Sequence, residues 1–326
     1  MSQKHPIVAV TGSSGAGTTT VLHAFRDIFR RENINAAFLD GEAFLRYERK
    51  EMNAAIAKAL AEGKSLSHFG PELNQFDNLE TLFKEYAEHG TGKTRHYVTE
   101  EHQARFKQAT GTFTQWQPIA PDSDLLFYEG LHGGVIARSW TRRQMSPSHN
   151  PAVIERRNAN TSNGVDVAQY VDLLLGVVPV VNLEWIQKIH RDTNVKGFSA
   201  EAVTNTILRR MRDYLHFLVP QFSISDINFQ RVPVVDTSNP FIARDVPAPD
   251  ESIVVIRFRE PDRFNFPSLL KRIDDSFMSR PNTMVIPGGK MQLAMEIICT
   301  PLIHELIEKT GADDIAVKRR PQSLST

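Results

Sequence analysis

A glycine-rich stretch near the start of the chain has the spacing of a phosphate-binding loop. In VAVTGSSGAGTTTVLHAF (Val8–Phe25), the pattern G-x-x-x-x-G-K-[ST] is met except that Thr18 replaces the lysine. Backbone N–H groups and a helix N-terminus make most of such a cradle, so the glycines matter more than the lysine. Thr19 keeps the hydroxyl expected on a metal ion. We therefore expect a nucleotide phosphate site formed by Gly12, Ser13, Ser14, Gly15, Ala16, Gly17, Thr18 and Thr19.

Acids and bases occur where a phosphate loop could use them. Glu129 closes the apolar segment DLLFYEG, and a carboxylate at a strand end can hold a metal ion or accept a proton. In NLEWIQKIHRD, Lys188, Arg191 and Asp192 are spaced at i, i+3 and i+4, so they share one helical face. Two cations beside an acid favour phosphate recognition over a solvated surface patch. Trp185, on the same segment, is expected to belong to the core.

The elements that must position these residues alternate between strands and helices. Apolar, β-branched runs predict strands at 6–10, 35–40, 124–129, 172–182, 231–238, 252–259 and 282–289. Helical periodicity predicts helices at 18–31, 51–63, 71–90, 183–192 and 290–310, the last of them broken near Pro301. Acidic Asp40 and Glu42 lie where the second strand would end. This alternation predicts an α/β sandwich with a largely parallel sheet.

Composition limits the class of partner. Lys plus Arg equals Asp plus Glu at 38 each, so there is no overall positive charge to attract nucleic acid. The longest dense apolar run, Leu173–Val181, is interrupted by Gly176 and Pro179 and is too short to span a bilayer. The single cysteine, Cys299, fits a reducing cytosol. We expect a cytoplasmic protein with a small-molecule partner, without nucleic-acid or membrane partners.

The whole chain, 1–326, is expected to form a single domain. Residues 138–164 are polar and rich in Ser, Asn and Arg, which is typical of a loop insertion. A polar C-terminal tail is expected from about residue 311.

Several segments together resemble the bacterial-type phosphoribulokinases. The segments that carry this likeness are VTGSSGAGTTT, SHFGPE, FYEGLHGG, GVVPVVNLEWIQKIHRD, PQFSISDINFQRVPVVDTSNPF and ESIVVIRFR, and it extends from about His5 to Pro301. That family belongs to the P-loop kinases with a nucleoside-monophosphate-kinase-like fold, a three-layer sandwich with a mostly parallel sheet. The resemblance implies that MgATP phosphorylates O1 of ribulose 5-phosphate, giving the bisphosphate that carbon fixation in the Calvin cycle consumes. It also implies a homo-oligomer.

The resemblance assigns a role to each matching residue. Bacterial members typically carry threonine at the position of Thr18, and Lys188 becomes the candidate for the missing charge. Glu129 and Asp192 match two acids linked to the metal ion, with Asp192 also linked to catalysis. The matching cations of the substrate site are Arg49, Arg191 and, in place of a family arginine, Lys196.

One loop departs from the family pattern. The family sequence GD-x-FHR is Gly41-Glu42-Ala43-Phe44-Leu45-Arg46 here, so the catalytic base is Glu42 instead of aspartate and histidine is replaced by Leu45. The longer acid and the less polar pocket leave two alternatives open. The chain could be a related kinase acting on another acceptor, such as a nucleoside, or a nucleotide-binding regulatory paralogue with weak catalysis.

Overall fold

The described part of the chain covers most of the predicted elements. The computed structural model describes residues 5–13, 18–64, 66–100, 102–120, 122–137, 164–178, 180–194, 197–243 and 245–318. At 18, 19 and 310–318 the description is limited to the backbone. Nearly all of the insertion predicted at 138–164, and residues 319–326 of the predicted tail, lie outside these ranges.

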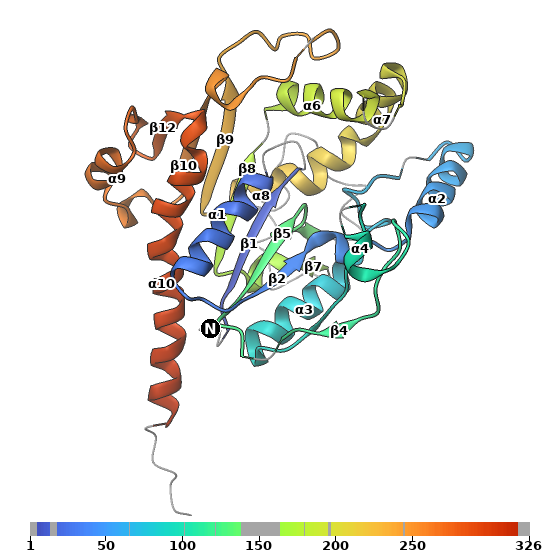
Figure 1. Ribbon diagram of the computed structural model, residues 1–326. Coiled ribbons are helices and arrows are strands. Elements are labelled where there is room, and N and C mark those ends of the chain that lie inside the picture. Colours follow the sequence, from blue (N-terminus) through green and yellow to red (C-terminus); the bar gives the residue numbers. More distant parts are fainter. Residues whose placement is uncertain are drawn as a thin grey trace, which may run out of the picture.

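A mostly parallel sheet forms the centre of the molecule (Figure 1). Within the described residues its eight strands are ordered β11-β12-β10-β9-β8-β1-β5-β2. The five strands from β9 to β2 run parallel, and the three at the other edge are antiparallel. The strands are β1 (Ile7–Gly12), β2 (Ala36–Asp40), β5 (Leu125–Gly130), β8 (Leu173–Val178), β9 (Ile227–Pro233), β10 (Ser252–Phe258), β11 (Phe277–Arg280) and β12 (Thr283–Pro287).

The α-helices of the described ranges are α1 (Thr18–Arg31), α2 (Arg49–Ala61), α3 (Phe76–His89), α4 (Gln103–Phe106), α6 (Val181–Asn194), α7 (Ala200–Asp213), α8 (Val219–Ile224), α9 (Phe266–Arg272) and α10 (Met291–Lys318). Helices α1 and α10 pack on one face of the sheet and α3 packs on the other, whereas α2 extends away from it (Figure 1). Two small antiparallel ladders pair β3 (Lys93–Thr94) with β4 (Gln117–Pro118), and β6 (Ile136–Ala137) with β7 (Val165–Asp166). None of the helices in the described ranges is long and apolar enough to cross a membrane.

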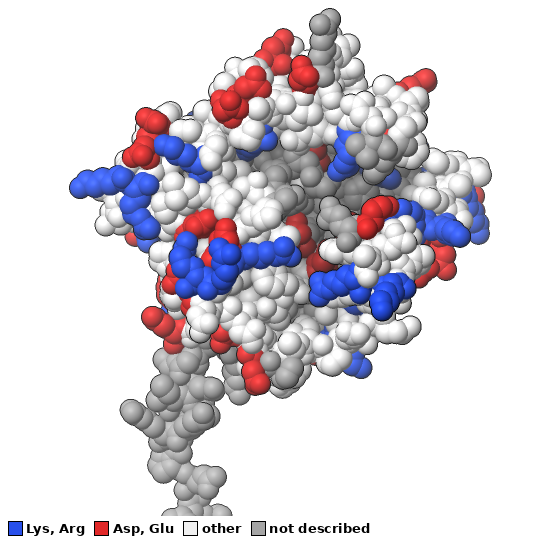
Figure 2. Space-filling view, viewed as in Figure 1, with Lys and Arg blue, Asp and Glu red and all other residues white. Residues whose placement is uncertain are grey.

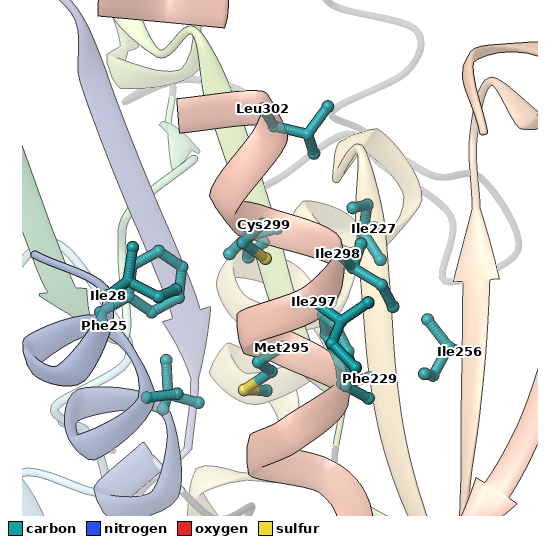
Figure 3. Close-up of a cluster of buried hydrophobic side chains, with 14 of the residues drawn as sticks. Phe25, Ile28, Ile227, Phe229, Ile256, Met295, Ile297, Ile298, Cys299 and Leu302 are labelled. Atoms are coloured by element: carbon teal, nitrogen blue, oxygen red, sulfur yellow. The ribbon is translucent and has the colours of Figure 1, made fainter. Parts of the chain in front are cut away.

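Strand alternation divides the core between the two faces. Val8 and Val10 of β1 pack into one cluster with α1 and α10, whose packing is drawn in Figure 3. Ile7 and Ala9, on the same strand, point to the opposite face and pack into a second cluster with α3. Successive side chains of a strand point to opposite faces, so each strand supplies both layers. The predicted three-layer α/β architecture is confirmed.

Three sequence-based expectations differ from the structure. Helix α10 is continuous through Pro301, so the predicted break is wrong: the ring is exposed, and buried Ile298, Leu302 and Ile303 hold both sides of it in the core. Strand β9 begins at Ile227 and ends at Pro233, earlier than predicted. Helix α7 was not predicted, because its apolar face is short and it carries three arginines.

The parallel strands bring their carboxyl ends to one edge of the sheet. In the β-sheet register Glu129 is beside both Val10 and Asp40, and Gly12 is beside Val177. Loops that leave this edge of an α/β sheet form its usual binding crevice. The start of the predicted phosphate loop (Gly12 and Ser13), Glu42 and Glu129 therefore lie at the same edge of the sheet.

Candidate active site

A cavity of about 550 Å³ opens at the carboxyl ends of β1, β2 and β5, below α6 and α7. Figure 1 shows these two helices at that edge of the sheet. The cavity is lined by Gly12, Ser13, Asp40, Gly41, Glu42, Leu45, Met52, His68, Phe69, Asn74, Tyr97, Glu129, Gly130, Leu131, His132, Glu184, Trp185, Lys188, Arg191, Ile207, Arg210, Met211 and Tyr214. Asp40, Glu42 and Glu129 come from the strand ends, whereas the two helices supply Lys188, Arg191 and Arg210 together with one acid, Glu184.

Two glycines let the acidic strand ends approach each other. A Cβ atom at Gly41 would lie 2.5 Å from Tyr128 Oη and 3.0 Å from Gly130 Cα. A Cβ atom at Gly130 would lie 2.7 Å from the same hydroxyl and 2.9 Å from Gly41 Cα. Real side chains do not occur at such distances. Both turns thus pack against the hydroxyl of buried Tyr128. This hydroxyl oxygen also accepts a hydrogen bond from the His132 N–H at 3.2 Å.

The turn that carries Glu42 is a single short 3₁₀ helix, Gly41–Phe44. Asp40 caps it, because its Oδ1 accepts a hydrogen bond from the Glu42 N–H at 2.8 Å. Burial raises the pKa of Asp40, and this backbone hydrogen bond acts in the opposite direction. Buried Ala43 and Phe44 anchor the turn in the core, so that Glu42 and Leu45 are left to line the cavity.

Helix α6 supplies the predicted group of two cations and an acid. Lys188 Nζ donates to Asp192 Oδ2 at 2.5 Å, and Arg191 Nε donates to Asp192 Oδ1 at 3.3 Å. The predicted shared face is therefore confirmed. Asp192 is only 6% exposed, so its carboxylate holds both cations from within the protein. Burial lowers the pKa of Lys188, and the ion pair with Asp192 raises it again.

Helix α7 adds an arginine that the sequence analysis missed. Arg210 lines the cavity, and within the described residues its buried Nε has no hydrogen-bond partner. Burial lowers the pKa of Arg210 to about 10. Burial also lowers the pKa of His68 well below its usual range, and the charges of Arg210 and Lys188 act in the same direction. The cavity wall here is cationic beside a neutral histidine, which suits an anionic ligand.

The start of α6 holds a further buried acid. Tyr214 Oη donates to Glu184 Oε2 at 3.1 Å. Burial raises the pKa of Glu184, while the hydroxyls of Ser13 and Tyr214 lower it. Trp185, expected in the core, is half-buried and lines the cavity, with its ring 5.6 Å from that of Phe241.

The predicted site residues divide into three groups. Gly12, Ser13, Glu42, Glu129, Lys188 and Arg191 line the cavity, and Asp192 is held beside it. Arg49 is absent from the lining residues of the described chain, and it forms an ion pair with Glu100 at 3.0 Å. The side chains of Thr18 and Thr19, and all of Ser14, Gly15, Ala16, Gly17 and Lys196, lie outside the described part of the chain.

The acids present are compatible with magnesium. In the described residues no group of three or more His, Cys, Asp or Glu could hold a metal ion alone. Mg²⁺ in kinases does not need such a cage, because it keeps water ligands and uses one or two protein oxygens with the substrate phosphates. Glu129 at the cavity wall offers such an oxygen, whereas both oxygens of Asp192 accept hydrogen bonds from cations.

Comparison with known proteins gives consistent relatives. Residues 7–238 match the model of the Phosphoribulokinase / Uridine kinase family. The chain is 54% identical over 311 residues to the chromosomal phosphoribulokinase of Cupriavidus necator, covering 95% of this chain and 98% of that protein. It is 52% identical over 309 residues to a probable phosphoribulokinase of Escherichia coli K12, covering 94% and 98%. A solved phosphoribulokinase from Rhodobacter spheroides matches with a TM-score of 0.81 at 49% identity, covering 94% of this chain and 99% of that one.

Proposed function

Because the chain belongs to the Phosphoribulokinase / Uridine kinase family, we propose that it uses ATP to phosphorylate O1 of D-ribulose 5-phosphate. The product is ribulose 1,5-bisphosphate. One observation carries this proposal: a single cavity is lined by the end of strand β1, by four carboxylates that include Glu42 and Glu129, and by cationic side chains of α6 and α7. The relatives named phosphoribulokinase match almost the whole chain, which favours this acceptor over a nucleoside.

The cations of α6 and α7 are suited to bind the phosphates. We assign the charge missing from the loop at Thr18 to Lys188, which Asp192 holds at the cavity wall. A cation so fixed stabilises the charge of the transferring phosphoryl group without reorganisation. Arg191 and Arg210 are assigned to the phosphate of the sugar, since a guanidinium matches the geometry of a phosphate. Arg49 and Lys196 are proposed as further cations of that site.

Glu42 is the proposed general base. It accepts the proton of the O1 hydroxyl as that oxygen attacks the γ-phosphorus of ATP, and the bond from the γ-phosphorus to the bridging oxygen breaks to release ADP. The strand end and the Asp40 cap hold its backbone, which favours a fixed position for the carboxylate. Asp192 contributes indirectly, because it positions Lys188 and Arg191.

A magnesium ion is proposed to complete the nucleotide site. Glu129 and the hydroxyl of Thr19 would hold it together with phosphate oxygens and water. When bound, it would neutralise charge on the β- and γ-phosphates. Asp192 stays a candidate ligand if it exchanges one of its cations for the metal ion.

We propose that the protein works in the cytoplasm as a homo-oligomer. The buried thiol of Cys299, the chain's single cysteine, supports a reducing compartment. Light scattering of the purified protein measures the oligomeric state, and a monomeric mass at micromolar concentration would refute the second part.

A coupled assay of ADP release tests the proposed function. We expect MgATP-dependent turnover with ribulose 5-phosphate, and less with uridine, ribose 5-phosphate or no acceptor. Glu42→Gln keeps the shape of the side chain and removes its basicity, so we expect a loss in kcat of about 10²–10⁴-fold. Turnover of a nucleoside but not of the sugar phosphate would overturn the acceptor, and wild-type kcat in the variant would overturn the base.

A further inference from the structure

Residues 93–118, from β3 to β4, form a long connection that packs against the Glu42 turn and the start of α2. We call it the 93–118 segment. Its backbone pairs with itself through the Tyr97–Phe113 bridge. It contacts the segment that follows Glu42 at several points: Arg49 N donates to Gly111 O at 2.8 Å, and Phe113 N donates to Glu48 Oε1 at 3.3 Å.

Arg95, in this segment, donates two hydrogen bonds to the turn that carries Glu42. Its Nε donates to Ala43 O at 2.9 Å, and its Nη2 donates to Leu45 O at 2.7 Å. The guanidinium also lies over two aromatic rings, 3.5 Å from the centroid of Phe113 and 4.7 Å from that of Trp116. Contact with these rings restrains the plane of the guanidinium, and the plane sets the direction of its two hydrogen bonds.

The two acceptor carbonyls belong to the turn that carries the base. The carbonyl between them, Phe44 O, accepts from Gln75 N at 2.8 Å. The carbonyl before them, Glu42 O, accepts from Leu45 N at 3.1 Å. Gln75 Nε2 also donates to Leu45 O, at a longer 3.4 Å. Arg95 therefore supplies short hydrogen bonds to the carbonyls on both sides of Phe44, and among the described residues no backbone N–H outside the turn donates to either carbonyl.

We propose that Arg95 is a positioning residue for the phosphoryl transfer, which it serves by fixing the Glu42 turn against the cavity. The inference rests on the proposed function, because it takes Glu42 as the base. Arg95 acts through the backbone of 43–45, and it is not among the cavity-lining residues of the described chain. Trp116, whose ring contacts the Arg95 guanidinium, also contacts Phe44, with 5.9 Å between ring centroids. The turn is therefore held both by the hydrogen bonds of Arg95 and by this ring contact.

The expected effect follows from geometry. Without the guanidinium the turn keeps its core anchor and the Asp40 cap, so we expect it to form but to place Glu42 less accurately. A misplacement of about 1 Å can cost roughly 10²-fold in rate. We expect Arg95→Ala to lower kcat by about 10–10²-fold. Since Lys188 and the phosphate loop are untouched, the KM for ATP should change by less than about twofold.

Three further variants separate positioning from general damage. Arg95→Lys keeps the charge but cannot donate to both carbonyls from one rigid fork, so it should restore only part of the loss. Arg105→Gln is the matched control: Arg105 lies in the same segment and over the ring of Phe106 at 5.2 Å, but no contact from it to the Glu42 turn occurs among the described residues. It should leave kcat unchanged. The double variant Arg95→Ala/Glu42→Gln measures the coupling.

The experiment compares kcat, KM and thermal unfolding for these variants, with and without added guanidinium ion. The wild-type rate tests the proposed function, and the variant-to-wild-type ratio tests the role of Arg95. Rescue of Arg95→Ala by guanidinium, and little further loss in the Glu42→Gln background, would support the inference. Wild-type kcat in Arg95→Ala would overturn it, as would a full additive loss without rescue. If Arg95→Ala does not fold, an undiminished kcat in folded Arg95→Lys would overturn it.

Discussion

Gly41→Ala tests whether the two acidic strand ends must touch. The added methyl group would lie 2.5 Å from Tyr128 Oη, 3.1 Å from Tyr128 Cζ and 3.0 Å from Gly130 Cα. Two of these neighbours belong to a fully buried ring and the third is backbone, so none can rotate away. The turn that carries Glu42 must therefore move away from β5.

The size of the movement follows from the contacts. Carbon atoms pack at about 3.5–4.0 Å, so the contacts must open by roughly 0.5–1 Å. Overpacking of this kind costs about 1–3 kcal/mol of stability. A displacement of the base by such a distance should lower kcat by about 10–10²-fold. The KM for ATP should stay near the wild-type value, because the phosphate loop leaves the neighbouring strand β1.

The assay measures kcat with ribulose 5-phosphate and thermal unfolding for Gly41→Ala, with Gly289→Ala as control. No described heavy atom lies within 4 Å of the Cβ position at Gly289, so this variant should behave as wild type. Removing the hydroxyl in Gly41→Ala/Tyr128→Phe relieves the shortest contact and should recover part of kcat. A wild-type kcat in Gly41→Ala, or an equal loss in the control, would refute this account of the site.

Two other predictions concern titratable groups of the cavity. Lys188→Met should lower kcat by about 10²-fold or more in the coupled assay, because a preorganised cation is lost; a raised KM for ATP with unchanged kcat would contradict its role. Burial lowers the pKa of His132 to about 4, so the unfolded chain binds its proton between pH 6.5 and 4 and stability falls as the pH falls through that window. His132→Gln should remove about 3 kcal/mol of this pH dependence in urea titrations, and identical slopes in both proteins would exclude it.

Local patterns predicted much of the site from the sequence. The helix at 18–31 and the strand before it were expected, and the i, i+3, i+4 spacing correctly placed Lys188, Arg191 and Asp192 on one face. The acids Glu42 and Glu129 were also predicted from local sequence, because each follows or closes an apolar run typical of a strand. Where a strand stops is encoded nearby in the chain, and parallel strands bring their ends to one edge of the sheet. Residues whose role depends on one element could thus be found.

Residues whose role depends on packing between distant elements were missed. Arg210 reaches the cavity because α7 packs against α6 through Val203, Ile207 and Met211, and the sequence does not show which element that apolar stripe packs against. Arg95 belongs to a segment with little regular structure, and its partners Ala43 and Leu45 are some fifty residues earlier. Pro301 shows the reverse error, since a local helix breaker is overridden by the core that α10 covers. Such contacts have no periodic signal.

Thr18 replaces the usual lysine of a phosphate loop, and the proposed substitute, Lys188, is held in a different way. A lysine in a phosphate loop is fixed by the short, glycine-rich loop itself, whereas Lys188 is fixed by Asp192 one helical turn away. That arrangement requires a second residue, and it accounts for an acid that is only 6% exposed beside the proposed phosphate site. Glu42 is fixed in a comparable way, by Asp40 and Arg95 on either side of its turn. Both proposed catalytic groups therefore depend on partners that need not touch the substrate, and variants of those partners should change kcat more than binding.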